Sequence, residues 1–559
     1  MVERILNLIH REIRGVHEAA YLLGLFALFS QVLALIRDRL LASSFGAGSV
    51  LDVYYAAFRI PDVIFVSVAS LVSIYVLIPF LAEKSAISED EERKFISTIF
   101  SAFALIILFI SAVMFLFTPQ LLGVIFPGLV DSPLYSDLVI LTRILLLQPI
   151  LLGISSLFGS ITQTRQRFIL YALSPLLYNL GIIGGILFLY PLFGIPGLGY
   201  GVVLGALLHL VIQLPFIIKT GFVPRFSFSI NLSEVKKVVF LSLPRTLALS
   251  ANQIALLFLI SFASLMAVGS ITVFNLSFNL QAVPLSIIAV SYSVAAFPTL
   301  ARLFSNGEQK QFLEQMLVAA RHILFWSTPA IALFVVLRAQ IVRVVLGSGA
   351  FDWADTRLTA AVLALFAISL TAQGLNLLFI RGYYASGNTK KPLIINVISS
   401  ILIVAFSYLF IKLFATFEGW RFFFESLLRV EDLAGTEILM LPLGYSLAVI
   451  INAIVFWIAF QKDFKSFSFS LSTVFFQSLS AAIVLGFVAY QFLEILDNVF
   501  DINTFWGIFL QGALSGMAGI IAAVILLKLT KSKELSEVWK SLHHKFWKTR
   551  AVASEQTEL

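Results

Sequence analysis

The sequence predicts an all-α, polytopic membrane protein with about 14 transmembrane helices. Hydrophobic residues make up 59% of its 559 residues, the mean hydropathy is +0.97, and only 12% of the residues are charged. A soluble domain carries about 25% charged residues. The apolar runs are about 20 residues or longer, the length of a helix that crosses a bilayer. Because only helices and closed barrels satisfy their backbone in lipid, such runs predict helices.

The predicted spans follow one another with short connections. They lie at 20–38, 53–82, 95–118, 137–160, 168–190, 198–219, 237–264, 270–301, 312–337, 356–381, 391–415, 438–461, 472–494 and 503–528. Four of them contain prolines that predict kinks, namely Pro61, Pro175, Pro284 and Pro329.

Lysine and arginine residues are distributed as the positive-inside rule requires. The loops near 119–136, 191–197, 264–270 and 495–502 contain neither residue, whereas the intervening loops hold pairs such as Lys390 and Lys391. We therefore expect both termini to be cytoplasmic. The same distribution accounts for the net charge of +7, so no nucleic-acid partner is expected. The absence of cysteine excludes disulfides and thiol chemistry.

Several segments outside the spans have helical patterns. Residues 1–19 predict a cytoplasmic amphipathic helix rather than a cleavable signal sequence. The outside insertion at 416–437 and the basic cytoplasmic tail at 529–559 both predict helices that lie in the membrane interface. Ser88 precedes a run of acids and predicts a helix N-cap.

An internal repeat organises the chain. The segment from Gly48 to Ala82 resembles the segment from Gly269 to Ala301, at an offset of about 220 residues that covers six spans. An even number of spans gives both repeats the same orientation in the membrane. We therefore expect an N-lobe of six helices at 20–219 and a C-lobe at 237–461. A cytoplasmic linker at 220–236 joins them, and two further spans lie at 462–528.

Ionisable residues concentrate around the first two spans. Arg37, Asp38 and Arg39 end the first span, Asp52 opens the second, and Arg59 and Asp62 flank Pro61. Each such group costs roughly 2.5–3.5 kcal/mol at bilayer depth, so it needs a partner or a wet cavity. One interpretation is pairing that only holds helix ends together. The other is a cavity for an anionic ligand such as a phosphate, which the forked arginine guanidinium suits.

Two further arginines are candidates for the same cavity. Arg245 follows Pro244 at the start of the seventh span, and Arg143 lies in the fourth. The predicted substrate-binding set is therefore Arg37, Arg59, Arg245, Asp38, Asp52, Asp62 and Arg143. No phosphate-binding loop, zinc motif or nucleophile motif accompanies these residues, so we expect a transporter without ATPase activity, cofactor or metal.

Four segments resemble one family. RDRLLASSFGAGSVLDVYYAAFRIPD at 37–62, LPRTLALSANQI at 243–254, FPTLARL at 297–303 and RGYYASGNTKKP at 381–392 are similar to segments of the MurJ/MviN lipid II flippases. That family belongs to the multidrug/oligosaccharidyl-lipid/polysaccharide exporter superfamily. The resemblance implies fourteen helices, a cationic cavity, and movement of undecaprenyl-pyrophosphate-linked disaccharide-pentapeptide across the bacterial cytoplasmic membrane. Arg37, Asp38, Asp52, Arg59 and Arg245 match family positions.

The sequence also departs from the family pattern. Other residues stand where the resemblance implies cavity charges, a glutamate-glycine pair, a sodium-linked acid, or asparagine or acid positions of the eleventh helix. They are Gln31, Phe65, Val66, Ser70, Leu71, Leu259, Phe278, Asn279, Ile403 and Ser407. Three hypotheses follow. In the first, the chain is a monomeric lipid II flippase that works by alternating access. Its partners are then the lipid-linked precursor, membrane lipids and the cell-wall synthesis machinery. Alternatively, it transports another lipid-linked saccharide or amphiphile, or it is a membrane scaffold that has lost the transport site.

Overall fold

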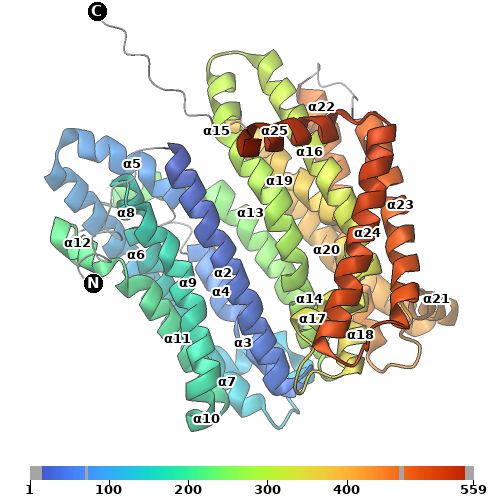
Figure 1. Cartoon of the computed structure of the whole chain (residues 1–559). Coiled ribbons are helices and arrows are strands. Elements are labelled where there is room, and N and C mark those ends of the chain that lie inside the picture. Colours follow the sequence, from blue (N-terminus) through green and yellow to red (C-terminus); the bar gives the residue numbers. More distant parts are fainter. Residues whose placement is uncertain (1–15, 69–73, 229, 465–470, 548–559) are drawn as a thin grey trace, which may run out of the picture. The chain divides into compact units, whose positions relative to one another are not determined.

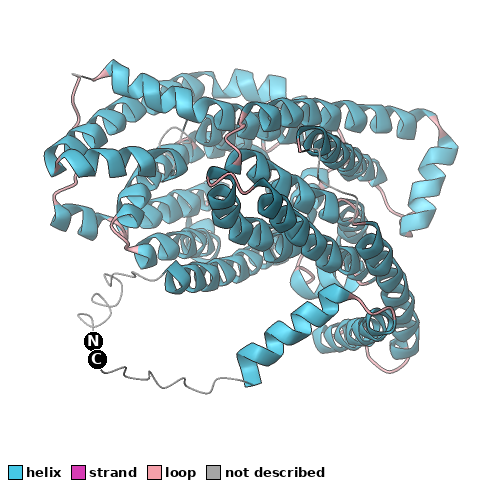
Figure 2. Ribbon diagram, turned by 90° about the horizontal axis from the view of Figure 1, so that it is seen from above, coloured by secondary structure: helices cyan, strands magenta, loops and turns pink. Residues whose placement is uncertain are grey.

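The computed structural model describes residues 16–68, 74–228, 230–464 and 471–547. Within these ranges the chain is helical and contains no strand (Figure 2). Most of the expected N-terminal helix and the end of the tail lie outside the described residues, as do Ser70 and Leu71.

The helices of the first half follow the predicted spans (Figure 1). They are α2 (Val16–Phe45), α3 (Ser49–Ala57), α4 (Arg59–Val68), α5 (Ile74–Ile87), α6 (Glu89–Ile125), α7 (Tyr135–Leu145), α8 (Leu147–Thr164), α9 (Phe168–Gly184), α10 (Tyr190–Phe193), α11 (Ile195–Val211), α12 (Leu214–Thr220) and α13 (Leu232–Ser264).

The second half continues in the same way. It contains α14 (Ser270–Leu285), α15 (Ser291–Ser305), α16 (Gln309–Val336), α17 (Arg338–Val345), α18 (Trp353–Ala367), α19 (Leu370–Ala385), α20 (Lys390–Thr416), α21 (Glu418–Leu428), α22 (Met440–Asp463), α23 (Ser472–Asp497), α24 (Phe505–Leu529) and α25 (Lys533–Trp547).

The prediction of a polytopic helical membrane protein is confirmed. Among the described residues, 11 helices are long and apolar enough to cross a membrane, and the bent pair α18 and α19, with 44° between them, raises the number to 12. The segments α2 and α3–α5, which overlap the predicted spans 20–38 and 53–82, are not in this number. The count of 14 therefore stays a prediction.

The chain packs into two compact units. The first comprises Met1–Val283, Val345–Phe366 and Asn388–Asn452, and the second Pro284–Val344, Ala367–Gly387 and Ala453–Leu559. This division by packing differs from the division at 20–219 and 237–461 that the repeat predicts, and the two lobes remain a prediction.

In the first unit, glycines let α9 and α11 cross at close range. Gly197, Gly201 and Gly205 recur every fourth residue on α11. Gly205 faces Gly181 on α9, Gly201 faces Gly185 just after it, and Gly197 faces the backbone of Leu189. A Cβ atom on Gly201 would lie 2.4 Å from the Cα atom of Gly185. Small residues at this spacing allow helix backbones to pack tightly where no hydrophobic effect drives them together. The crossing fixes the position of α9, which carries cavity residues.

The insertion at 416–437 forms a helix, as predicted. α21 buries Phe424 and Leu428 and exposes Phe422, Phe423 and Leu427, a pattern typical of a helix that rests in the interface. The following loop is fixed to α18, because the Arg357 guanidinium donates to both oxygens of Asp432 at 2.6 and 2.7 Å. This hydrogen bonding holds the pKa of the Asp432 carboxyl below its ordinary value.

The second unit is built on α16, which packs against α19 and α23, while α23 pairs with α24. Its core is aromatic, with ring contacts among Phe312, Phe379, Tyr383, Phe456 and Phe460. The tail forms α25, and Glu537 on this helix lies 3.2 Å from His322 Nε2 on α16. In the first unit, the Ser88 side chain accepts a hydrogen bond from the Glu91 amide at the start of α6, which confirms the predicted N-cap.

We predict that Gly201→Ala destabilises the protein by about 1–3 kcal/mol, because the new methyl group would overlap the backbone of Gly185. Thermal unfolding of the purified protein in detergent measures the effect. Gly184→Ala is the matched control, since nothing lies within 4 Å of a Cβ atom at that position. Equal unfolding temperatures for both variants would contradict the role assigned to the crossing.

Candidate functional site

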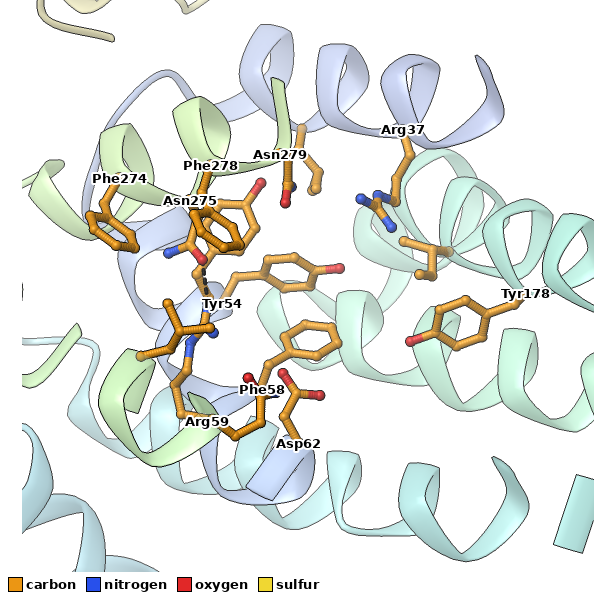
Figure 3. A pocket seen from close by; sticks show the side chains of 15 residues that line it. Arg37, Tyr54, Phe58, Arg59, Asp62, Tyr178, Phe274, Asn275, Phe278 and Asn279 are labelled. Carbon is orange, nitrogen blue, oxygen red and sulfur yellow. Dashed lines mark hydrogen bonds between the residues drawn. The ribbon is translucent and has the colours of Figure 1, made fainter. Parts of the chain in front are cut away.

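A cavity of about 280 Å³ lies within the first compact unit, among α2, α3, α4, α9, α13 and α14 (Figure 3). Three charged side chains line it, namely Arg37, Arg59 and Asp62. All three were predicted from the sequence as parts of a cavity wall. Figure 3 shows Arg37 and Tyr178 on one side of the open space and Arg59 and Asp62 at the other.

Asp38 holds the Arg37 guanidinium in place. Arg37 Nε and Nη2 donate to Asp38 Oδ1 at 2.9 and 2.7 Å, and Arg37 Nη1 donates to Asn179 on α9 at 3.1 Å. The second oxygen of Asp38 accepts from Asn279 on α14 at 3.0 Å. Asp38 is buried and does not line the cavity, so its place in the site is to orient Arg37.

Arg59 lies in the cavity wall at a short interruption of the second span. α3 ends at Ala57 and α4 begins at Arg59, with Pro61 in the first turn of α4, where a missing N–H costs no hydrogen bond. Arg59 Nη2 donates to Asn275 on α14, the contact drawn as a dashed line in Figure 3. Arg59 Nε is buried and has no hydrogen-bond partner among the described residues.

The two guanidinium groups keep several donors available for a ligand. Each arginine has five N–H donors. The contacts above engage three donors of Arg37 and one donor of Arg59. The remaining donors suit the oxygens of a phosphate or diphosphate, which arginine binds through paired N–H groups.

The substrate-binding set predicted from the sequence contains no uncharged lining residue, although Phe278 and Asn279 were noted as departures from the family pattern. Gln253, Asn275 and Asn279 contribute amides, and the ring-bearing residues are Tyr54, Tyr55, Phe58, Tyr178, Phe274 and Phe278. Asn275 and Asn279 are one turn apart on α14. Two amides at this spacing inside an apolar span are the sequence pattern that could have indicated a polar cavity wall. The Tyr55 hydroxyl, like Arg59 Nε, is buried and has no hydrogen-bond partner in the described part of the chain. Aromatic walls with a few convergent polar groups are typical of small-molecule sites.

Asp52 lies outside the cavity and caps α14. Its carboxylate accepts from the Gly269 amide at 2.6 Å, the Thr272 amide at 2.8 Å and the Thr272 hydroxyl at 2.7 Å. A carboxylate at a helix N-terminus satisfies amides without intrahelical partners and interacts favourably with the helix dipole. Asp52 therefore connects α3 of the predicted N-lobe to α14 of the predicted C-lobe.

Two neighbouring contacts complete this connection. Ala350 N donates to Ser43 O at 2.8 Å, and Ala47 N donates to Asp355 Oδ2 at 3.0 Å. Gly269 has a φ of 91°, and a Cβ atom there would lie 2.2 Å from Ala47 O, so glycine is required. We call residues 43–52, 269–272 and 349–355 the turn cluster.

The two other predicted cations, Arg143 and Arg245, do not line the cavity, and neither does Arg39. Arg143 donates to Phe115 O at 3.2 Å and lies over the Phe115 ring. Arg245 is half-buried on α13, and Arg39 donates to Val345 O at 3.3 Å.

The sequence-family model for lipid II flippase MurJ matches residues 41–418, more than half of the chain. The chain belongs to this family. A probable lipid II flippase MurJ of Buchnera aphidicola subsp. Acyrthosiphon pisum is 28% identical over 376 residues, which cover 66% of this chain and 73% of the relative.

Solved structures of a MurJ and of a MATE transporter share the fold. A structure of lipid II flippase MurJ in an inward closed conformation matches with a TM-score of 0.73 and 23% identity, covering 93% of this chain and 99% of that chain. An inward-facing multidrug-resistance MATE transporter of the MOP superfamily matches with a TM-score of 0.64 and 15% identity, covering 78% and 95%. The family model thus confirms the MurJ family resemblance, and the solved structures share the fold.

We predict that Asp52→Ala lowers the free energy of unfolding by about 1–3 kcal/mol, because the buried amides of Gly269 and Thr272 lose their acceptor. Thermal unfolding in detergent measures the loss. Asp131→Ala is the control, since Asp131 is exposed. A stability of Asp52→Ala equal to that of this control would show that the cap contributes nothing.

Proposed function

We propose that this protein is a flippase that moves lipid II, a polyprenyl-diphosphate-linked peptidoglycan precursor, across the bacterial cytoplasmic membrane. The observation that carries the proposal is the pair Arg37 and Arg59, which present unused donors to one cavity among membrane-spanning helices. The membership in the MurJ family and the name of the Buchnera relative support the same substrate.

The diphosphate is the part of lipid II that this cavity suits best. Pockets that hold drug-sized ligands have volumes of roughly 300–1,000 Å³, and the present cavity has about 280 Å³. A diphosphate with an adjoining sugar ring is of this size, whereas a disaccharide-pentapeptide is larger. Passage of the complete headgroup therefore requires the helices around the cavity to separate.

Alternating access is the mechanism that we propose for this separation. The turn cluster lies at the side that the charge distribution predicts to be outside, and it joins α2 and α3 to α14 and α18. In our proposal these contacts close the outside while the cavity opens to the cytoplasm, and they release when the two lobes exchange access. The termini face the cytoplasm, and the protein works as a monomer with the cell-wall synthesis machinery, without ATP hydrolysis on this chain.

A second candidate cargo is a different lipid-linked saccharide. The observation that favours it is the lining itself, in which aromatic rings and amides outnumber the arginines. Flat aromatic faces and amides contact sugar rings well. This candidate keeps the lipid diphosphate at Arg37 and Arg59 and changes only the sugar.

We predict that this protein sustains growth of bacteria depleted of their own lipid II flippase, and that Arg37→Ala with Arg59→Ala abolishes the rescue. Hydrogen bonds to charged groups contribute ~1.5–3 kcal/mol, so each substitution lowers headgroup affinity by roughly 10- to 100-fold. Growth after depletion, with immunoblots of the membrane fraction, is the measurement.

Arg143→Ala is the matched control, because this arginine contacts Phe115 and does not line the cavity. Failure of well-expressed wild-type protein to rescue growth would exclude lipid II and leave the second cargo. Full rescue by the double variant would exclude the cavity as the site and would agree with a scaffold.

A further inference from the structure

Asp62 differs from the other acids near the cavity because nothing in the described part of the chain donates a hydrogen bond to it. It lies one turn after Arg59 on α4, lines the cavity and is partly exposed to it. Asp38 and Asp52, by contrast, each accept three hydrogen bonds and are buried. Their carboxylates are satisfied by the protein, whereas the carboxyl group of Asp62 is available to solvent and ligand.

The charges around the cavity cancel when Asp62 is ionised. Arg37 and Arg59 are positive, and Asp38 and Asp62 are negative. The elements packed against α4 bring no further formal charge to the lining. α8 has no charged residue, those of α6 lie at 89–94, and Glu234, Lys236, Lys237 and Arg245 on α13 and Asp137 and Arg143 on α7 do not line the cavity.

The remaining titratable groups at the cavity are phenols. Tyr54 and Tyr55 come from α3 and Tyr178 from α9, and Asp62 faces the same open space as Tyr178 in Figure 3. Phenols ordinarily titrate near pH 10. Asp62 is therefore the lining group whose charge can change under physiological conditions without breaking a hydrogen bond or ion pair within the described structure.

An anionic headgroup and an ionised Asp62 oppose each other in this space. A diphosphate diester brings two negative charges, and like charges within a few ångströms favour protonation of one of them. A protonated carboxyl group has an O–H donor, which a phosphate oxygen accepts. Protonation thus replaces a repulsion by a hydrogen bond.

We propose that Asp62 is a proton-binding site, and that an anionic lipid headgroup binds in the cavity together with one proton on Asp62. The carboxylate oxygen forms an O–H bond with a proton that arrives from bulk solvent as hydronium, whose O–H bond breaks so that it leaves as water. The inference rests on the proposed function for the nature of the headgroup. It adds that each headgroup binds together with one proton.

Thermodynamic linkage between proton binding and headgroup binding determines how the headgroup affinity changes with pH. Binding that takes up one proton becomes weaker as pH rises, by at most about tenfold for each pH unit. Asn at position 62 stays neutral at every pH and has nearly the shape of a protonated Asp. Asp62→Asn should therefore bind the headgroup as tightly at high pH as at low pH.

The experiment measures binding to the purified full-length chain in lipid nanodiscs from about pH 5 to about pH 8, the range in which a perturbed carboxyl group titrates. The probes are a short-chain prenyl diphospho-N-acetylglucosamine and UDP-N-acetylglucosamine. Both are diphosphate diesters without a group that titrates in this range. Tighter binding of the prenyl probe identifies the ligand as a lipid headgroup rather than a soluble diphosphate.

We expect wild-type affinity for the prenyl probe to fall with rising pH and the affinity of Asp62→Asn to stay constant. Asp131→Asn, which removes an exposed acid distant in sequence from the cavity residues, should retain the wild-type pH dependence. A pH-independent wild type, or a pH dependence that persists in Asp62→Asn, overturns the inference while growth rescue leaves the proposed function intact. Absence of binding at every pH, together with failed rescue, overturns both.

Discussion

The ion pair between Arg37 and Asp38 is the interaction on which the candidate site depends. A guanidinium among membrane helices must be paired or hydrated, and here one carboxylate oxygen accepts two of its donors. Asn179 on α9 and Asn279 on α14 complete the arrangement, so a single charge fixes three helices. Because Asp38 satisfies only one edge of the guanidinium, the other donors can face the cavity.

Limited access to water also determines how the helices pack around the site. Backbone amides at the start of α14 have no solvent to bind, and Asp52 supplies the acceptor from α3. Where no polar contact is available, as between α9 and α11, glycines bring backbones close enough for dispersion to hold them. The seam includes Gly205 against Tyr178 O, so it also sets the position of the tyrosine that lines the cavity.

The sequence predicted the helices and the cations of the cavity, but it could not assign each polar group its direction. Charge in an apolar span is visible in sequence, so Arg37, Arg59 and Asp62 could be placed at the cavity wall. Whether a carboxylate faces the cavity or a helix end depends on its angle around the helix. Asp52 accepts hydrogen bonds at the start of α14 and Arg143 contacts Phe115, so neither lines the cavity. Asn275 was not identified from the sequence, and Asn279 was noted there only as a departure from the family pattern.

The neutral balance of the cavity explains how the chain tolerates fewer arginines than the resemblance implies. An empty cavity with a large positive charge is costly in a medium of low dielectric constant, because nothing offsets its desolvation. Here Asp38 and Asp62 offset Arg37 and Arg59, so the empty site carries no net charge. Phe65 and Val66, which stand where the resemblance implies arginines, therefore add no cation that would need a further partner. A bound anion therefore has to replace one of these carboxylates as the negative charge that balances the arginines. Asp62 is the carboxylate that no hydrogen bond holds in the described part of the chain.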